Sequence, residues 1–162
     1  MDRSSMIQHD DYVSFIFNGT EKQAAQHRQQ FMTQLECHAI HRVHFIKNTT
    51  QFTNEHISHR LAFLVIDNNQ HSIGRLYLNG PTMVISQHIT GLQCKYDNVP
   101  LFYLDEGEEI HCELETERGT GHRHQKWNAV AAITYNNIDT NRWQFEFELT
   151  GRLTLDEILQ QI

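Results

Sequence analysis

Apolar and polar residues alternate in several short segments of the chain, and this period of two predicts β-strands. The clearest case is residues 142–149, in which every second residue is apolar: Trp143, Phe145, Phe147 and Leu149. Alternation also predicts strands near residues 13–17, 43–45, 73–78, 82–89, 110–115 and 129–135. The turn Asn79-Gly80-Pro81 separates two of these strands.

Two segments in the first half of the chain follow the helical period instead. Thr20 and Gln23 have the spacing of a capping box, so a helix is expected to begin there. Its apolar stripe consists of Ala24, Phe31, Met32 and Leu35. Asn54 is expected to cap a short second helix, which carries Ile57, Leu61 and Leu64 on one side.

A third helix is expected near the last residue. Thr154 and Glu157 form a second capping box, and an apolar stripe of Leu155, Ile158, Leu159 and Ile162 follows. An exposed apolar stripe needs a surface on which to pack, so we expect the isolated chain to be unstable or to self-associate. The mixture of short strands and a few helices predicts an α+β fold.

Composition restricts the classes of function. The 162 residues, 39% of them hydrophobic, suffice for one domain or two small ones. The formal net charge of -7 argues against direct binding of nucleic acid, which requires a basic face. No apolar run is long enough for a membrane helix, and no signal stretch follows Met1. We therefore expect a soluble intracellular protein, in the nucleus or cytoplasm, with no membrane partner.

The cysteines and histidines give no convincing catalytic or metal site. Cys37, Cys94 and Cys112 form no Cys-x-x-Cys pair, so neither a disulfide framework nor a zinc site, and no cofactor, is expected. The 12 histidines include His41 and His44, which a strand would place on opposite faces. Two alternatives stay open: a small-ligand or nucleotide enzyme that uses the histidine-rich loops, and a stand-alone scaffold.

The segment from Asn48 to Leu61 resembles a signature of the RNA polymerase alpha/D family, which comprises the bacterial alpha, the archaeal D-type and the eukaryotic third-largest polymerase subunits. In that family an Asn-Thr pair precedes a stretch that typically reads Asp-Glu-Phe-Ile-Ala-His-Arg-Leu. The matching residues here are Asn48, Thr49, Glu55, Ile57, His59, Arg60 and Leu61. The segment from Ala24 to Ile40 is similar to the first helix of the family, with Arg28, Ala39 and Ile40 matching. The leucine of the family pattern is His27 here, and its second arginine is Gln29.

Three further segments resemble the family in the same order. Asn98-Val99-Pro100-Leu101 and the following Leu104 to Glu108 are similar to a Pro-Ile-x-x-Leu-x-x-Gly-Gln passage. Gly119-x-Gly121-x-x-His124-Gln125-Lys126-Trp127 is similar to Gly-x-Gly-x-x-His-Ala-Lys-Trp, and the proline two residues further on in the family is Ala129 here. Residues 145–153 resemble the strand that returns to the dimerisation domain.

The resemblance implies a split architecture and a structural role. Residues 12–65 and 141–162 would form a discontinuous dimerisation domain, and residues 66–140 an inserted β-rich domain. The chain would be a non-catalytic assembly subunit that pairs with a smaller alpha-like subunit and docks the large catalytic subunits; small zinc-type subunits are further possible partners. The connection from Ile66 to Ser72 lacks the cysteines of metal-containing relatives. A compact, zinc-free member suggests the polymerase of a large DNA virus.

The candidate site residues are the expected subunit contacts of such an assembly protein. Arg28, His59 and Arg60 are candidate polar anchors, and the alternative for them is hydrogen bonding within the chain. Lys126 and Trp127 are expected to contact a neighbouring subunit, with a core position for Trp127 as the alternative. The apolar candidates on the first and last helices are Phe31, Leu35, Leu155, Ile158, Leu159 and Ile162.

Overall fold

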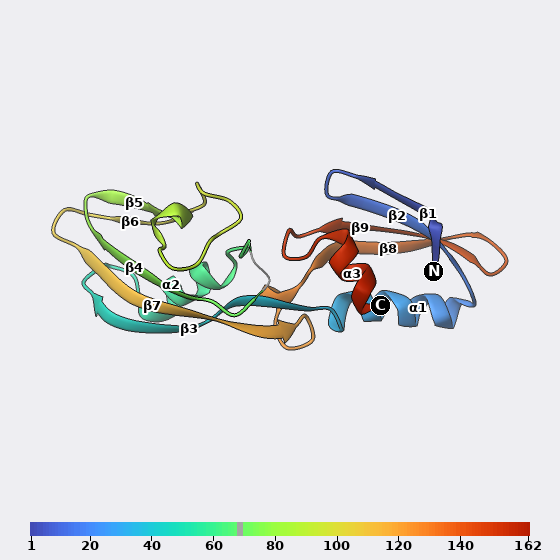
Figure 1. Ribbon diagram of the computed structural model, residues 1–162, viewed down its shortest axis with the longest axis horizontal. Helices are drawn as coiled ribbons and strands as arrows, with labels where there is room; N and C mark the ends of the chain where they lie inside the picture. The colour runs from blue at the N-terminus through green and yellow to red at the C-terminus, as the bar shows by residue number, and fades with distance from the viewer. Residues whose placement is uncertain (68–69) are drawn as a thin grey trace. The chain divides into compact units, whose positions relative to one another are not determined.

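In the part of the chain that the structure describes, strands and three α-helices form an α+β fold, as the alternation and the capping boxes predict (Figure 1). The structure is a computed structural model, and it describes residues 1–67 and 70–162. These residues form two compact units: residues 1–37 with 119–162 (unit 1), and residues 38–118 (unit 2). None of the helices in the described part of the chain is long and apolar enough to cross a membrane.

Unit 1 contains an antiparallel sheet with the strand order β1-β2-β9-β8. Its strands are β1 (Asp2–His9), β2 (Tyr12–Asn18), β9 (Arg142–Leu149) and β8 (Val130–Asp139). The pairing of Phe15 with Phe145 and of Val13 with Phe147 fixes the register of the two central strands. All four of these side chains are buried, which accounts for the strict alternation in β9.

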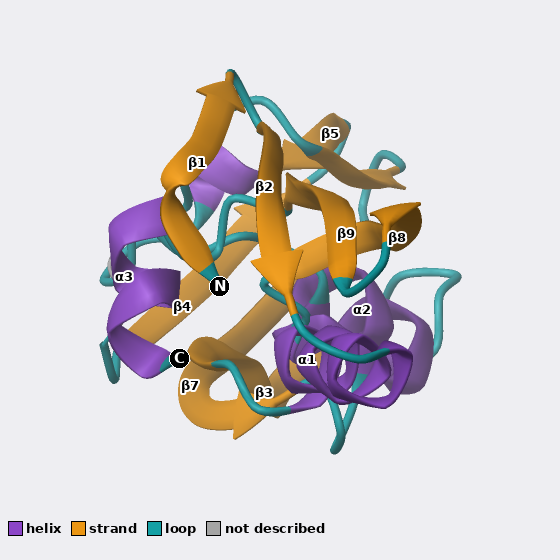
Figure 2. Ribbon diagram, turned by 90° about the vertical axis from the view of Figure 1, so that its right-hand side faces the viewer, coloured by secondary structure: helices purple, strands orange, loops and turns teal. Residues whose placement is uncertain are grey.

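The helix α1 (Glu21–Thr33) packs on the apolar face of this sheet (Figure 2). Thr20 and Gln23 form the predicted capping box, because each side chain accepts a hydrogen bond from the backbone N–H of the other residue. Phe31 lies 5.7 Å from the ring of Phe15 and 5.2 Å from that of Phe147. Aromatic contacts therefore join the helix to the two central strands.

The last helix of unit 1 is α3 (Leu155–Gln161), with the predicted capping box of Thr154 and Glu157. Ile158 is completely buried. The Gln161 side chain joins the helix to the start of β3 by hydrogen bonds to the backbone N–H and C=O of Glu36. The described contacts of unit 1 thus cover part of the terminal apolar stripe.

The described residues of unit 2 form two sheets and one α-helix. One sheet has the order β3-β7-β4, and the other pairs β5 with β6. The element bounds are β3 (Glu36–Asn48), β4 (Ile73–Asn79), β5 (Thr82–Ile85), β6 (Pro100–Leu104), β7 (Glu109–Thr120) and α2 (Asn54–Ala62). The chain enters this unit through β3 and leaves it through β7. A 3₁₀ turn occurs at Ser86–His88 in unit 2, and another at Gln125–Trp127 in unit 1.

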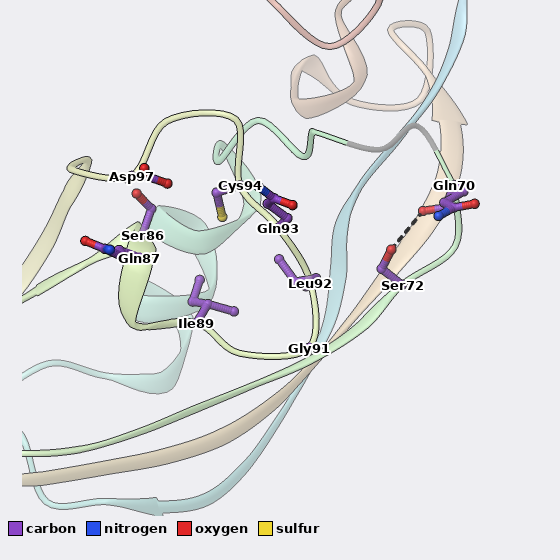
Figure 3. A pocket seen from close by; sticks show the side chains of 10 residues that line it. All are labelled: Gln70, Ser72, Ser86, Gln87, Ile89, Gly91, Leu92, Gln93, Cys94 and Asp97. Carbon is purple, nitrogen blue, oxygen red and sulfur yellow. Dashed lines mark hydrogen bonds between the residues drawn. The ribbon is translucent and has the colours of Figure 1, made fainter.

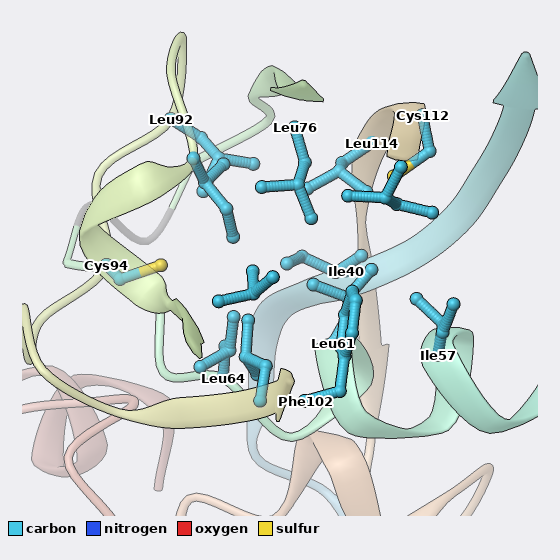
Figure 4. Close-up of a cluster of buried hydrophobic side chains, with 14 of the residues drawn as sticks. Ile40, Ile57, Leu61, Leu64, Leu76, Leu92, Cys94, Phe102, Cys112 and Leu114 are labelled. Atoms are coloured by element: carbon cyan, nitrogen blue, oxygen red, sulfur yellow. The ribbon is translucent and has the colours of Figure 1, made fainter. Parts of the chain in front are cut away.

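The core of unit 2 lies between α2 and the sheets (Figure 4). Ile57 and Leu61 of α2 are completely buried, as are Leu76 of β4 and Ile110 and Cys112 of β7. The alternation predicted for residues 110–115 is confirmed, because His111, Glu113 and Glu115 lie on the other, more exposed face of β7.

The two units divide the chain at other points than the resemblance implies. The expected domains were 12–65 with 141–162, and 66–140. In the structure, α2 shares the core of unit 2 with Leu76 and Leu104, so residues 38–65 belong to that unit. Pairing with β9 places β8 in unit 1. A discontinuous unit with an insertion is present, but the insertion comprises residues 38–118.

Two local expectations are also corrected. Residues 82–89 do not form one strand: β5 ends at Ile85, since the backbone turns at Ser86, whose hydroxyl donates to the carbonyl of Tyr96. The cap of α2 is Thr53 and not Asn54, because the Thr53 hydroxyl accepts from the backbone N–H of His56 at 3.1 Å. Asn68 and Asn69 of the cysteine-free connection lie outside the described residues.

Candidate functional site

A loop that leads from β3 into α2 is held by the side chain of Asn48. The Asn48 amide nitrogen donates to the carbonyl of Phe52 at 3.0 Å and to Asn54 Oδ1 at 2.8 Å. Its oxygen accepts from the backbone N–H and the hydroxyl of Thr50. The Asn48 side chain thus forms hydrogen bonds with Thr50 and Phe52 of the loop and with Asn54, the first residue of α2. These bonds fix the orientation of the first residues of α2.

The neighbouring Thr49 fastens the same loop to β7. Its backbone N–H donates to the carbonyl of Glu109 at 3.0 Å, and its hydroxyl accepts from the Glu109 N–H at 2.7 Å. The Asn48-Thr49 pair is therefore a structural device that positions the helix bearing His59 and Arg60. This explains physically why the pair precedes the helix in the signature.

The segment 99–101 lies beside α2 at the start of β6. Val99 is held by a reciprocal pair of bonds with Ser86: the Ser86 N–H donates to the Val99 carbonyl, and the Val99 N–H donates to the Ser86 hydroxyl. Pro100 begins β6, and Leu101 is buried. Two segments quoted for the family resemblance, 48–61 and 98–101, are thus brought together within unit 2.

Between these segments is a groove of about 470 Å³, which we call the α2 groove. Its lining is mostly apolar with a basic part, and consists of His56, His59, Arg60, Phe63, Leu64, Val99, Pro100 and Leu101. Phe63, at the end of α2, keeps 42% of its surface exposed. An exposed phenylalanine in a concave apolar site is a typical feature of a protein-docking surface.

The ionisable residues that line the α2 groove are all basic: His56, His59 and Arg60. His56 stacks on Phe52 with a centroid distance of 5.0 Å, and the ring of His59 packs edge-on against Phe63 at 5.1 Å. No carboxylate of a described residue forms an ion pair with the exposed Arg60 guanidinium. In a chain of net charge -7, the ionisable lining of this groove is locally basic.

The structure separates the predicted site residues. His59 and Arg60 lie exposed in the α2 groove. In unit 1, Arg28 is half-buried, and its Nε donates to the carbonyl of Ile133 at 3.2 Å. The candidate residues from the sequence do not include His56, Phe63, Val99 and Pro100, which also line the groove. Two of these, Val99 and Pro100, belong to the segment 98–101 that resembles the family.

The apolar candidates of unit 1 are more covered than the sequence suggests. Phe31, Leu35 and Ile158 are at most 2% exposed, so their side chains belong to the core of unit 1. The stripe residues Leu155, Leu159 and Ile162 are half-buried. Within α1, Met32 is the exposed large apolar residue, at 38%.

The side chain of Trp127 lies in the core of unit 1, the position given above as the alternative to a subunit contact. It is 1% exposed, and Lys126 beside it is 8% exposed. The Lys126 ammonium lies 4.5 Å from the Trp127 ring centroid, and the Arg123 guanidinium lies 4.9 Å from it. A ring that is buried within its own chain has no surface left to bury on a partner.

A second cavity of about 500 Å³ lies in unit 2 beside the 3₁₀ turn at Ser86 (Figure 3). It is lined by Gln70, Ser72, Ser86, Gln87, Ile89, Gly91, Leu92, Gln93, Cys94 and Asp97. Burial raises the pKa of the Cys94 thiol to about 11, and Asp97 adds to the shift. The thiol is therefore protonated at neutral pH and a poor nucleophile.

The second cavity gives no support to the alternative of an enzyme with histidine-rich loops. No histidine is among the described residues that line the second cavity. Within residues 1–67 and 70–162, no three His, Cys, Asp or Glu side chains are grouped as ligands for a metal ion. The described residues form an α+β fold with a groove whose lining is apolar and basic.

The chain is similar to several known proteins, although no family model matches it. Subunit Rpo3 of the DNA-directed RNA polymerase of Methanocaldococcus jannaschii is 26% identical over 141 residues, which cover 83% of this chain and 73% of the relative. Rpo3 of Methanobrevibacter smithii is 27% identical over 151 residues, 79% of this chain and 55% of the relative. A conjugation stage-specific protein of Tetrahymena thermophila is 24% identical over 155 residues, covering 67% of this chain and 50% of that protein.

These similarities agree with the motif order and the α+β fold. The chain is similar to archaeal DNA-directed RNA polymerase subunits named Rpo3, and this similarity supports its resemblance to the RNA polymerase alpha/D family. It spans 73% of the Methanocaldococcus relative but little more than half of the relatives from Methanobrevibacter and Archaeoglobus. Origin in a virus stays a prediction.

Proposed function

We propose that the chain is a non-catalytic assembly subunit of a multisubunit DNA-directed RNA polymerase. It would pair with a smaller alpha-like subunit and dock the large catalytic subunits. The observation that carries the proposal is the α2 groove, because two segments of the family resemblance, far apart in the sequence, meet to line it. Similarity to polymerase subunits named Rpo3 supports the same function.

The occupant of the α2 groove is proposed to be an apolar segment of a large subunit that carries a carboxylate. Phe63, Val99 and Pro100 offer apolar surface to it. Arg60 offers a planar set of donors that suits a carboxylate, and no described acidic side chain of this chain occupies them. A pair of this kind, buried on assembly, contributes to specificity as well as affinity.

The smaller alpha-like subunit is proposed to pair with unit 1. The candidate surface combines Met32 and Arg28 on α1 with the half-buried Leu155, Leu159 and Ile162 at the C-terminal end. Phe31, Leu35 and Ile158 would support this surface from the core. Lys126 and Trp127 would support pairing indirectly, because their buried side chains stabilise the fold of unit 1.

The test is a native pull-down of the tagged chain from its own cells, followed by mass spectrometry. We expect the large polymerase subunits and a smaller alpha-like subunit in stoichiometric amounts. In a parallel pull-down, Arg60→Gln should lower recovery of the large subunits while the smaller subunit stays bound. The matched control is Arg75→Gln, which removes an exposed arginine of β4 elsewhere in unit 2.

Two results would contradict the proposal. If the chain is recovered alone or with partners unrelated to polymerase, the proposed function is wrong. If polymerase subunits are recovered equally with both arginine variants, the chain is a polymerase subunit but the α2 groove does not dock the large subunits.

A further inference from the structure

His27 lies on the inner side of α1, within a cage of phenylalanine rings. It is 8% exposed. Its ring stacks on Phe17 with a centroid distance of 4.8 Å and an angle of 20° between the planes. Edge-on contacts follow with Phe31 at 5.0 Å, Phe145 at 5.5 Å and Phe15 at 5.8 Å. A titratable ring thus occupies the centre of the contact between helix and sheet.

The polar atoms of this ring are unequally satisfied. Nδ1 lies 3.2 Å from Oε1 of Gln30, and because an amide oxygen only accepts, Nδ1 carries the hydrogen. Nε2 is then an acceptor; it is buried and has no partner in the described part of the chain. The neutral ring leaves one acceptor unsatisfied, whereas the protonated ring would place a charged donor in the same apolar surroundings.

No negative charge faces the ring from any element packed against it. The neighbours on β2 and β9 are Phe15, Phe17 and Phe145, and those on α1 are Phe31 and the neutral side chain of Gln30. Burial lowers the pKa of His27; the bond to Gln30 opposes this shift, and the positive α-amino group of Met1 adds to it. Burial among the phenyl rings therefore favours the neutral ring and outweighs the opposing effect of the Gln30 bond.

A shallow cavity of about 250 Å³ opens beside the ring, lined by Phe17, Asn18, Gln23, Gln26, His27 and Gln30. It brings solvent to the edge of the cage, so a proton can reach the site without unfolding of the sheet. The resemblance to the family places a leucine where this chain has His27. A leucine would fill a similar space among the phenyl rings without a titratable group.

We infer that His27 makes the contact between α1 and the sheet of unit 1 acid-sensitive, so that protonation of the ring loosens the helix and exposes its phenylalanine cage. This regulation is independent of the α2 groove. The direction follows from linkage: the folded state holds the neutral ring more strongly than the unfolded chain, whose pKa is the ordinary 6.5. The stabilising contribution is complete above pH 6.5 and is lost as the pH falls from 6.5 through the lowered pKa of the folded state.

The experiment compares the purified full chain with its His27→Leu variant between pH 7.5 and pH 5. The wild type should lose more in Tm over this range than the variant, because only the wild type has a buried ring at this position that takes up a proton in acid. His122→Leu, which removes an exposed histidine of the same unit, should respond to acid as the wild type does.

Two site-specific measurements accompany the melting curves. Hydrogen exchange of the α1 amides should quicken on acidification in the wild type but not in His27→Leu. The ¹⁵N resonances of the ring should report an Nδ1–H tautomer that titrates below pH 6.5. The inference is overturned if the ring titrates at or above 6.5, or if acid affects both proteins equally.

Discussion

The ring of Trp127 lies directly against the backbone of Gly119. A Cβ atom built on Gly119 would be 2.4 Å from Cε2 of the ring, which is well inside van der Waals contact. Trp127→Ala should therefore empty a core site of unit 1 and lower the free energy of unfolding by about 3–5 kcal/mol. Chemical denaturation followed by circular dichroism measures this loss. An unchanged unfolding midpoint would restore the interpretation of Trp127 as an interface anchor.

Gly119→Ala should destabilise the chain by about 1–3 kcal/mol, because the added methyl group overlaps the Trp127 ring and must displace it. In the double variant with Trp127→Ala, the methyl group meets a cavity, so the combined cost should be well below the sum of the two single costs. Additive costs in the double-mutant cycle would show that the two positions do not act on each other.

Thr20→Ala removes a side chain that caps α1 and accepts from the Gln23 N–H at 3.2 Å. We expect a loss of about 0.5–2 kcal/mol in the free energy of unfolding, measured by denaturation. Thr20→Ser is the matched control, since it keeps the hydroxyl and should retain most of the stability. Equal losses in both variants would assign the effect to packing of the methyl group and not to the cap.

The three thiols should be unreactive in the folded protein. Burial raises the pKa of Cys37 to about 11 and that of Cys112 to about 12, and the Cys37 Sγ donates to the carbonyl of Trp127 at 3.2 Å. At pH 8 a disulfide reagent should therefore label the native chain slowly and the guanidinium-unfolded chain at all three cysteines. Rapid labelling of the native chain would show that a thiol is accessible and ionised.

Leu61, in the last turn of α2, and Phe63, at its C-cap, should respond differently to truncation. Leu61 is completely buried, and Leu61→Ala should cost about 2–5 kcal/mol of stability. Phe63 is 42% exposed in the α2 groove, and Phe63→Ala should change stability by less than about 1 kcal/mol while it reduces capture of the large polymerase subunits. Capture and stability that fall together in Phe63→Ala would indicate a structural role for this ring.

Most of the regular elements could be predicted, because their residues repeat with the period of the structure they form. β9 alternates strictly since one of its faces packs against α1, and both capping boxes form as expected. β1 was missed, since its bulge between Asp2 and Ile7 interrupts any alternation. The burial of Leu101, Phe102 and Leu104 likewise leaves β6 without a regular pattern.

The candidate site could be predicted only in part. The resemblance identified His59 and Arg60, which lie in the α2 groove. The remainder of the groove forms because residues 99–101 pack beside α2. This tertiary contact leaves no periodic pattern of apolar residues in the sequence, so it could not be predicted from that pattern. For Trp127, residue type favours an interface, because tryptophan is enriched at subunit contacts. The small size of Gly119 instead leaves room for the buried ring.

The split composition of unit 1 has a consequence for the order in which the protein folds during synthesis. Its central strand pair joins β2, which is made before unit 2, to β9, which is made after unit 2. Unit 2, residues 38–118, is complete in the nascent chain well before β9 emerges. Domains generally fold as their residues become available, so unit 2 should fold on the ribosome first. Until β9 is made, β2 and α1 lack their partner strand and their phenylalanines stay exposed. During this interval the waiting segment is a natural target for a chaperone.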